Sequence, residues 1–202
     1  MAANPRSLLK VVLTHEAGHA VAALVTIDQT ADIFVKARSD QPRPFAASYR
    51  IRDSQSDLYS GKVEPIDKVV MYAAGAKAEE VCLGITDSAG FVNDLGRIMS
   101  VRSTWEERCD EARCRASLKD APTELLDAAL AMLPHYWQQL KVVDEEIASN
   151  FARTGALIEQ HGGKLKFIAS AALASLDSLG EVNLADGLIL LTAAEIRALW
   201  VS

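Results

Sequence analysis

The stretch PRSLLKVVLTHEAGHAVAALV, residues 5–25, decides the fold, because its pattern predicts a long helix buried at the centre of the protein. Asn4 suits the N-cap of such a helix and Pro5 suits its first helical position. Only Gly18 interrupts the run of helix-forming residues. Apolar side chains occupy most of the helix circumference, which indicates that protein surrounds the helix. They are Leu8, Leu9, Val12, Leu13, Ala17, Ala20, Val21 and Leu24.

The rest of the pattern predicts a mainly α protein with a small β-sheet, that is, an α+β fold whose central helix lies in a helical bundle. Short strands are predicted at 32–37 and 45–51, where β-branched and aromatic residues flank a turn that contains proline. Further helices are predicted over 65–83, 91–117 and 164–177. A capping box, in which Thr192 precedes Glu195 by three residues, begins a last short helix.

Composition excludes several classes of protein. The chain has 202 residues and a net charge of −6, so it lacks the basic surface of a protein that binds nucleic acid or anionic lipid. Its three cysteines are not spaced as a cysteine zinc site or a disulfide framework. We expect no signal peptide and no membrane span, and therefore a cytoplasmic protein.

His15, Glu16 and His19 form an HExxH motif inside the predicted central helix, which therefore resembles the HExxH helix of zincin-like folds. Residues four apart lie on one helical face, so both imidazoles can bind a single Zn²⁺ ion. Glu16 is rotated by about 100° from His15 and can reach the nucleophilic water without binding the metal. The motif therefore predicts a zinc-dependent metallopeptidase with Glu16 as the general base.

The bland alternative is a chance motif, in which the two histidines are ordinary core residues. Glu16 argues against it, because a carboxylate on a buried helix is costly unless it is paired or functional. Gly18 also argues against it, since glycine weakens a helix and indicates a close approach by another segment. A zinc site needs a third protein ligand, and Asp94, Glu79 and Glu80 are the acidic candidates. Glu79 is alternatively an acceptor that orients one of the histidines.

Three sequence blocks together resemble the peptidase domain of the FtsH family of ATP-dependent zinc metalloproteases. The blocks are THEAGHA at 14–20, AAGAKAEE at 73–80 and SAGFVNDL at 88–95. The resemblance implies Zn²⁺ as cofactor, a polypeptide substrate and Asp94, the acidic residue of the NDL sequence, as third ligand. It also implies one domain over 1–202, with a metal-site half at 1–118 that includes the small sheet and a helical half at 119–202.

The chain also departs from that family. Ala89, Phe91 and Val92 replace the residues usual in the third block, and the GxxxxGK[ST] loop of an ATPase is absent from the sequence. We therefore expect a peptidase domain without its ATPase module. Such a domain cleaves unfolded or loosely structured chains, or works with a separate ATPase partner or by self-association.

A different class of function stays open, namely a non-catalytic peptide-binding or regulatory module that keeps the peptidase fold. The presence of Glu16 favours the enzyme, because a binding module has no use for a general base. For either function, the strand predicted at Phe45–Ile51 is expected to be an accessible sheet edge beside the metal. An extended peptide can pair with such an edge through its main chain.

Overall fold

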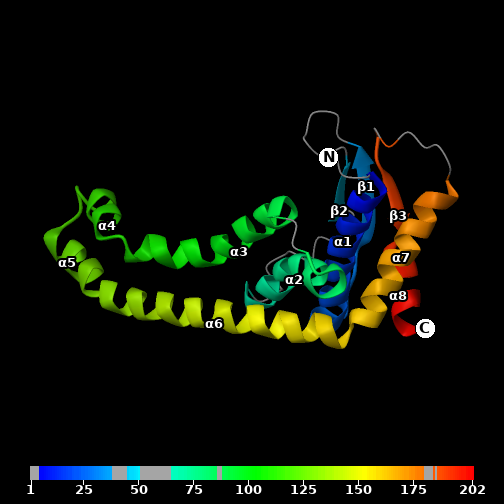
Figure 1. The fold of residues 1–202 in the computed structure, drawn as a ribbon. Coiled ribbons are helices and arrows are strands. Elements are labelled where there is room, and N and C mark those ends of the chain that lie inside the picture. The colour runs from blue at the N-terminus through cyan, green and yellow to red at the C-terminus, as the bar shows by residue number, and fades with distance from the viewer. Residues whose placement is uncertain (1–4, 38–44, 51–64, 86–87, 180–183, 185) are drawn as a thin grey trace.

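The computed structural model describes residues 5–37, 45–50, 65–85, 88–179, 184 and 186–202. In this part of the chain, helices predominate and three strands form one small sheet, which confirms the predicted fold class (Figure 1). In chain order the elements are α1 (Pro5–Ile27), β1 (Asp32–Ala37), β2 (Phe45–Arg50), α2 (Pro65–Leu83), α3 (Ser88–Cys109), α4 (Glu111–Ser117), α5 (Thr123–Ala131), α6 (Leu133–Gln160), α7 (Gly162–Ser178), β3 (Leu188–Leu191) and α8 (Ala193–Val201).

Helix α1 is the buried central helix that its sequence predicts. It packs against α2 on one side and α7 on another, and every residue from Leu13 to Leu24 is buried. Among the described helices, Arg6–Ile27 alone is long and apolar enough to cross a membrane, which the sequence reasoning overlooked. In this fold, however, 72% of its most apolar window lies buried inside the protein. The helix therefore serves as the core of the domain here.

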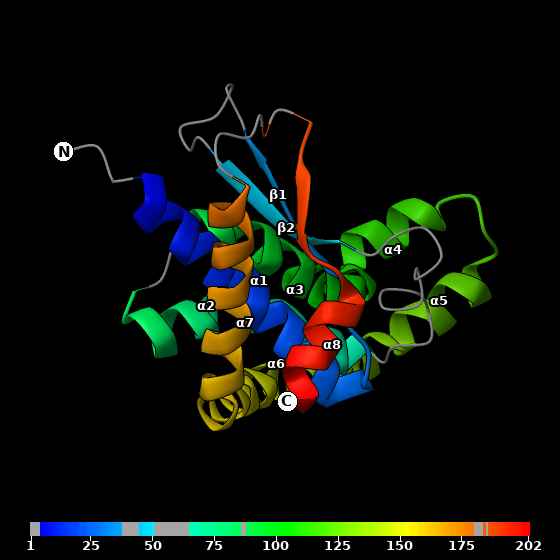
Figure 2. The same ribbon diagram turned by 90° about the vertical axis from the view of Figure 1, so that its right-hand side faces the viewer.

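The sheet has the strand order β2-β1-β3, and both pairings are antiparallel. The sequence predicted β1 and β2 but missed β3, because the run LILL is too short to distinguish a strand from a helix by its pattern. Strand β2 lies at one edge of the described sheet, as predicted, while Ile51 lies outside the described residues. Strand β3 lies on the other side of β1, where it contacts α7, and α8 follows β3 directly in the chain (Figure 2). The second half of the chain thus completes the sheet of the first.

Helices α3 and α6 run side by side away from the body, and α4 and α5 close the far end of this arm (Figure 1). Arg102 on α3 holds the two long helices together through a 2.7 Å ion pair with Asp144 on α6. The single helix predicted over 91–117 is wrong in two respects: α3 already begins at Ser88, and the helix breaks at Asp110. The Asp110 side chain accepts a hydrogen bond from the backbone N–H of Arg113 and begins α4 as its N-cap.

The contact between α1 and α2 is very close at Gly18, which explains the glycine in the middle of α1. A Cβ atom at this position would lie 2.5 Å from the carbonyl oxygen of Ala74 and 2.7 Å from the Cβ of Ala78. Both neighbours are already small, and the first is backbone that a side-chain rotation cannot move. Gly18 therefore sets how closely α2 can approach the HExxH motif.

We expect Gly18→Ala to destabilise the protein by about 1–3 kcal/mol, because overpacking outweighs the higher helix propensity of alanine. The matched control is Gly155→Ala on α6, where an added Cβ meets nothing within 4 Å. The control should stabilise the fold by up to about 1 kcal/mol. Urea unfolding of both variants measures the difference, and equal stabilisation by both would contradict the close approach.

Candidate metal centre

The two motif histidines project from the middle of α1 into a buried space between α1, α2 and α3. His15 and His19 are four residues apart, and their ring centroids lie 4.7 Å apart with an interplanar angle of 81°. Both side chains are buried. Because the Nε2 atoms converge on the same space, the helix presents two imidazole donors to one point.

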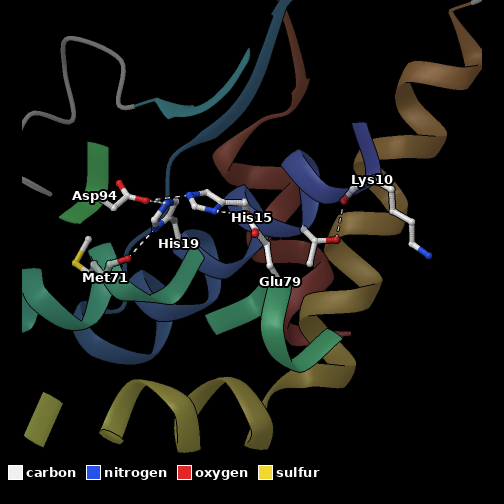
Figure 3. Close-up of polar contacts among 7 residues, drawn as sticks. Lys10, His15, His19, Met71, Glu79 and Asp94 are labelled. Carbon is white, nitrogen blue, oxygen red and sulfur yellow. Dashed lines mark hydrogen bonds and ion pairs between the residues drawn. The ribbon is translucent and has the colours of Figure 1, made fainter. Parts of the chain in front are cut away.

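Asp94, near the start of α3, completes this cluster (Figure 3). Its Oδ2 atom lies 2.9 Å from Nε2 of His15 and 3.3 Å from Nε2 of His19. Ligand atoms of the three side chains all lie within 4.8 Å of one another. Two ligands that are each about 2.0 Å from a tetrahedral ion are separated by roughly 3.3 Å. The two nitrogens and the carboxylate thus have donor types and a spacing that could hold a metal ion.

Each histidine is also held in place by a hydrogen bond at Nδ1, the ring nitrogen that does not face Asp94. Nδ1 of His15 donates to Oε1 of Glu79 at 2.7 Å, and Nδ1 of His19 donates to the carbonyl oxygen of Met71 at 2.7 Å (Figure 3). These bonds keep a proton on each Nδ1, so that Nε2 is the ring nitrogen that would face a metal ion once any proton on it is displaced. Such partners orient ligating histidines in metal sites generally.

The same contacts determine the direction in which the pKa values of His15 and Asp94 are shifted. Burial would lower the pKa of His15, but its hydrogen bonds with Asp94 and Glu79 outweigh burial and raise the pKa to about 10. Burial likewise opposes ionisation of Asp94, yet the hydrogen bonds to His15 and His19 hold the pKa of this carboxyl well below its usual range. A metal ion that binds here must displace a proton and occupies the place of a positive charge.

The three acidic candidates for the third ligand occupy different surroundings. Asp94 faces both histidines, and Glu79 contacts His15 from behind. Glu80 is exposed on α2 and pairs with Lys77 at 2.6 Å. Of the three, Asp94 therefore lies where a third ligand would face both histidines, and Glu79 lies where it contacts only the far ring nitrogen of His15. The general-base candidate, Glu16, is buried beside the cluster with 7% of its surface exposed.

Sequence reasoning missed two contributors to the centre. The first is the Met71 carbonyl, which no sequence pattern can reveal because every residue has one. The second is Gly75, where a Cβ atom would collide with the imidazole of His15. Gly75 lies four residues before Glu79 on α2, hence on the same helical face. That spacing was a usable signal, because the face that carries the partner of His15 must also make room for its ring.

Comparison with models of known protein families and with curated proteins gives no match to this chain.

We expect Asp94→Ala to lower zinc affinity more than either glutamate variant. Glu79→Ala should weaken zinc binding by roughly 10- to 100-fold, because it removes only an orienting hydrogen bond. Glu80→Ala is the matched control and should bind zinc like the wild type, since Glu80 is exposed. Competition with a chromophoric chelator measures all three affinities. If Asp94→Ala stays loaded with zinc while Glu79→Ala loses it, then Glu79 is the ligand and the assignment of Asp94 is wrong.

Proposed function

We propose that this protein is a zinc-dependent metallopeptidase that hydrolyses peptide bonds of unfolded or loosely structured polypeptides. The observation that supports this function best is the buried cluster of His15, His19 and Asp94. Glu16 lies on α1 between the two histidines of this cluster. Two imidazoles and one carboxylate are a ligand set of catalytic zinc sites, which keep a position for water. A cluster that served packing alone would gain nothing from three buried polar side chains.

The chemistry divides between the cofactor and the side chains. Zinc, when bound, lowers the pKa of water to about 7 and polarises the carbonyl group of the peptide bond. Glu16 takes the proton from the attacking water and delivers it to the amine nitrogen that leaves. Glu79 and the Met71 carbonyl keep the two imidazoles in the ligating tautomer during this exchange. Burial strengthens each of these interactions, because little water competes for them.

The substrate class follows from the sheet. Strand β2 lies at an edge of the described sheet and packs against α1, the helix that carries the motif. An extended chain that pairs with this edge is held by its backbone, with little demand on its sequence. Folded proteins do not offer such segments, so an unfolded polypeptide is the substrate that fits.

The FtsH-like arrangement of sequence blocks supports the same proposal and extends it. The HExxH motif, the helix that carries Glu79 and the segment that carries Asp94 are the blocks of that resemblance. In the structure, these blocks form one centre. We accordingly propose a peptidase domain of this type that acts in the cytoplasm, either with a separate ATPase or by self-association. The rival function, a peptide-binding module without catalysis, uses the same surfaces and differs in having no turnover.

Glu16→Gln should lower the rate of hydrolysis of an unfolded protein such as casein by about 10²- to 10⁴-fold, because it removes the general base. Zinc content and unfolding temperature should stay unchanged, since Glu16 is not a ligand. Glu80→Gln, the same substitution at an exposed position, is the control and should cleave normally. Cleavage by the wild type should stop with a chelator and return with zinc. Equal turnover by Glu16→Gln would refute its role, and inactivity of the zinc-loaded wild type would favour the binding module.

A further inference from the structure

Two side chains, Tyr72 and Arg97, lie close in sequence to contributors of the candidate metal centre and contact each other. Tyr72 follows Met71, whose carbonyl holds His19, and Arg97 lies three residues after Asp94 on α3. Residues three apart on a helix are neighbours, about 5–6 Å apart between Cβ atoms. The guanidinium carbon of Arg97 lies 5.5 Å from the centroid of the Tyr72 ring. The positive charge of Arg97, on α3, therefore rests against Tyr72, on α2, about one helical turn from Asp94.

Tyr72 is well placed to fix this charge. Its ring is half-buried and packs against the small apolar cluster of Val69, Ala73 and Ile98. Burial raises the pKa of the Tyr72 hydroxyl, Arg97 lowers it, and Asp94 raises it. The geometry agrees, because the ring that holds the cation follows directly after Met71, whose carbonyl contacts His19.

The surroundings of Arg97 differ from those of the next arginine on α3. Arg102 is held by two carboxylates, those of Asp144 and Glu106, and links the helices of the arm. Arg97 is exposed to solvent and lies over an aromatic ring. A guanidinium in this position keeps the in-plane N–H donors that bind a carboxylate in bidentate fashion.

The net negative charge of the candidate centre is the reason why a cation beside it would help a substrate carboxylate to bind. Glu16, Glu79 and Asp94 place three carboxylates in one buried region. A divalent metal ion offsets two of these charges, so the centre would still repel a peptide that carries a carboxylate. A cation at the border removes that repulsion and attracts the group.

We propose that Arg97, held over the ring of Tyr72, binds a carboxylate of the polypeptide substrate beside the metal centre. This inference rests on the proposed peptidase function and specifies its substrate. The carboxylate comes either from an acidic side chain within the substrate or from its free C-terminus. Arg97 acts on specificity, and the bond-breaking chemistry stays with Glu16.

Binding measured without turnover tests the proposal. Fluorescent peptides are titrated onto the Glu16→Gln protein in two matched pairs: Glu against Gln at one internal position with both ends blocked, and free acid against amide at the C-terminus. At least one pair should show about five- to tenfold tighter binding of the carboxylate form. That pair identifies the source of the carboxylate. Equal affinities within both pairs would overturn the proposal.

Adding Arg97→Gln to this protein should abolish the preference, and Arg97→Lys should restore only part of it, because lysine lacks the planar fork. Arg113→Gln makes the same charge change on α4, where Arg113 pairs with the surface carboxylate of Glu107, and should leave the preference intact. Tyr72→Phe keeps the ring and should keep the preference, whereas Tyr72→Leu should weaken it. A preference that survives Arg97→Gln would refute the assignment.

The titrations are repeated with zinc and with a chelator, because a zinc ion can itself bind a carboxylate. The dependence on Arg97 should persist without the metal, and a preference seen only with zinc would overturn the proposal. Hydrolysis by the wild type is measured separately. Its absence would count against the peptidase, whereas the Arg97 dependence of binding decides this inference alone.

Discussion

The close approach of α1 and α2 is the constraint on which the rest of the structure depends. Two glycines make it possible: Gly18 lets the backbone of α2 lie against α1, and Gly75 gives the imidazole of His15 its space. At this separation, Glu79 and the Met71 carbonyl come within hydrogen-bond distance of the two histidines. Larger side chains at these positions would part the helices and leave both imidazoles without their partners.

The same packing gives the buried carboxylates hydrogen-bond partners. Isolated carboxylates inside a protein are expensive, but Glu79 and Asp94 each contact an imidazole, which offsets the cost of burying them. The pairs are arranged as a chain, from Glu79 through His15 to Asp94. Because His15 bonds at both ring nitrogens, displacement of one contact changes the other. The orientation and the protonation of His15 are therefore coupled.

The sequence predicted those features that depend on local pattern. The bounds of α2, which runs from Pro65 to Leu83, follow from Pro65 and from Gly84, whose φ of 68° suits glycine. The Thr192–Glu195 capping box is likewise present. Features that depend on tertiary context were not predictable: β3 is a strand only because β1 offers it a partner, and the break at Asp110 interrupts a pattern that reads as continuous helix. The histidine spacing identified the centre, but only packing decides which carboxylate faces it.

The pairing of β1 with β3 joins segments that leave the ribosome at very different times. Ile33 is opposite Leu191, and the Asp32 side chain accepts a hydrogen bond from the backbone N–H of Ala193, 161 residues later. At ordinary translation rates this interval lasts roughly 10 to 30 s. Throughout that time the nascent β1 edge lacks its partner and can pair with a neighbouring chain. The same topology that closes the domain therefore leaves one edge of β1 open until almost the whole chain has been synthesised.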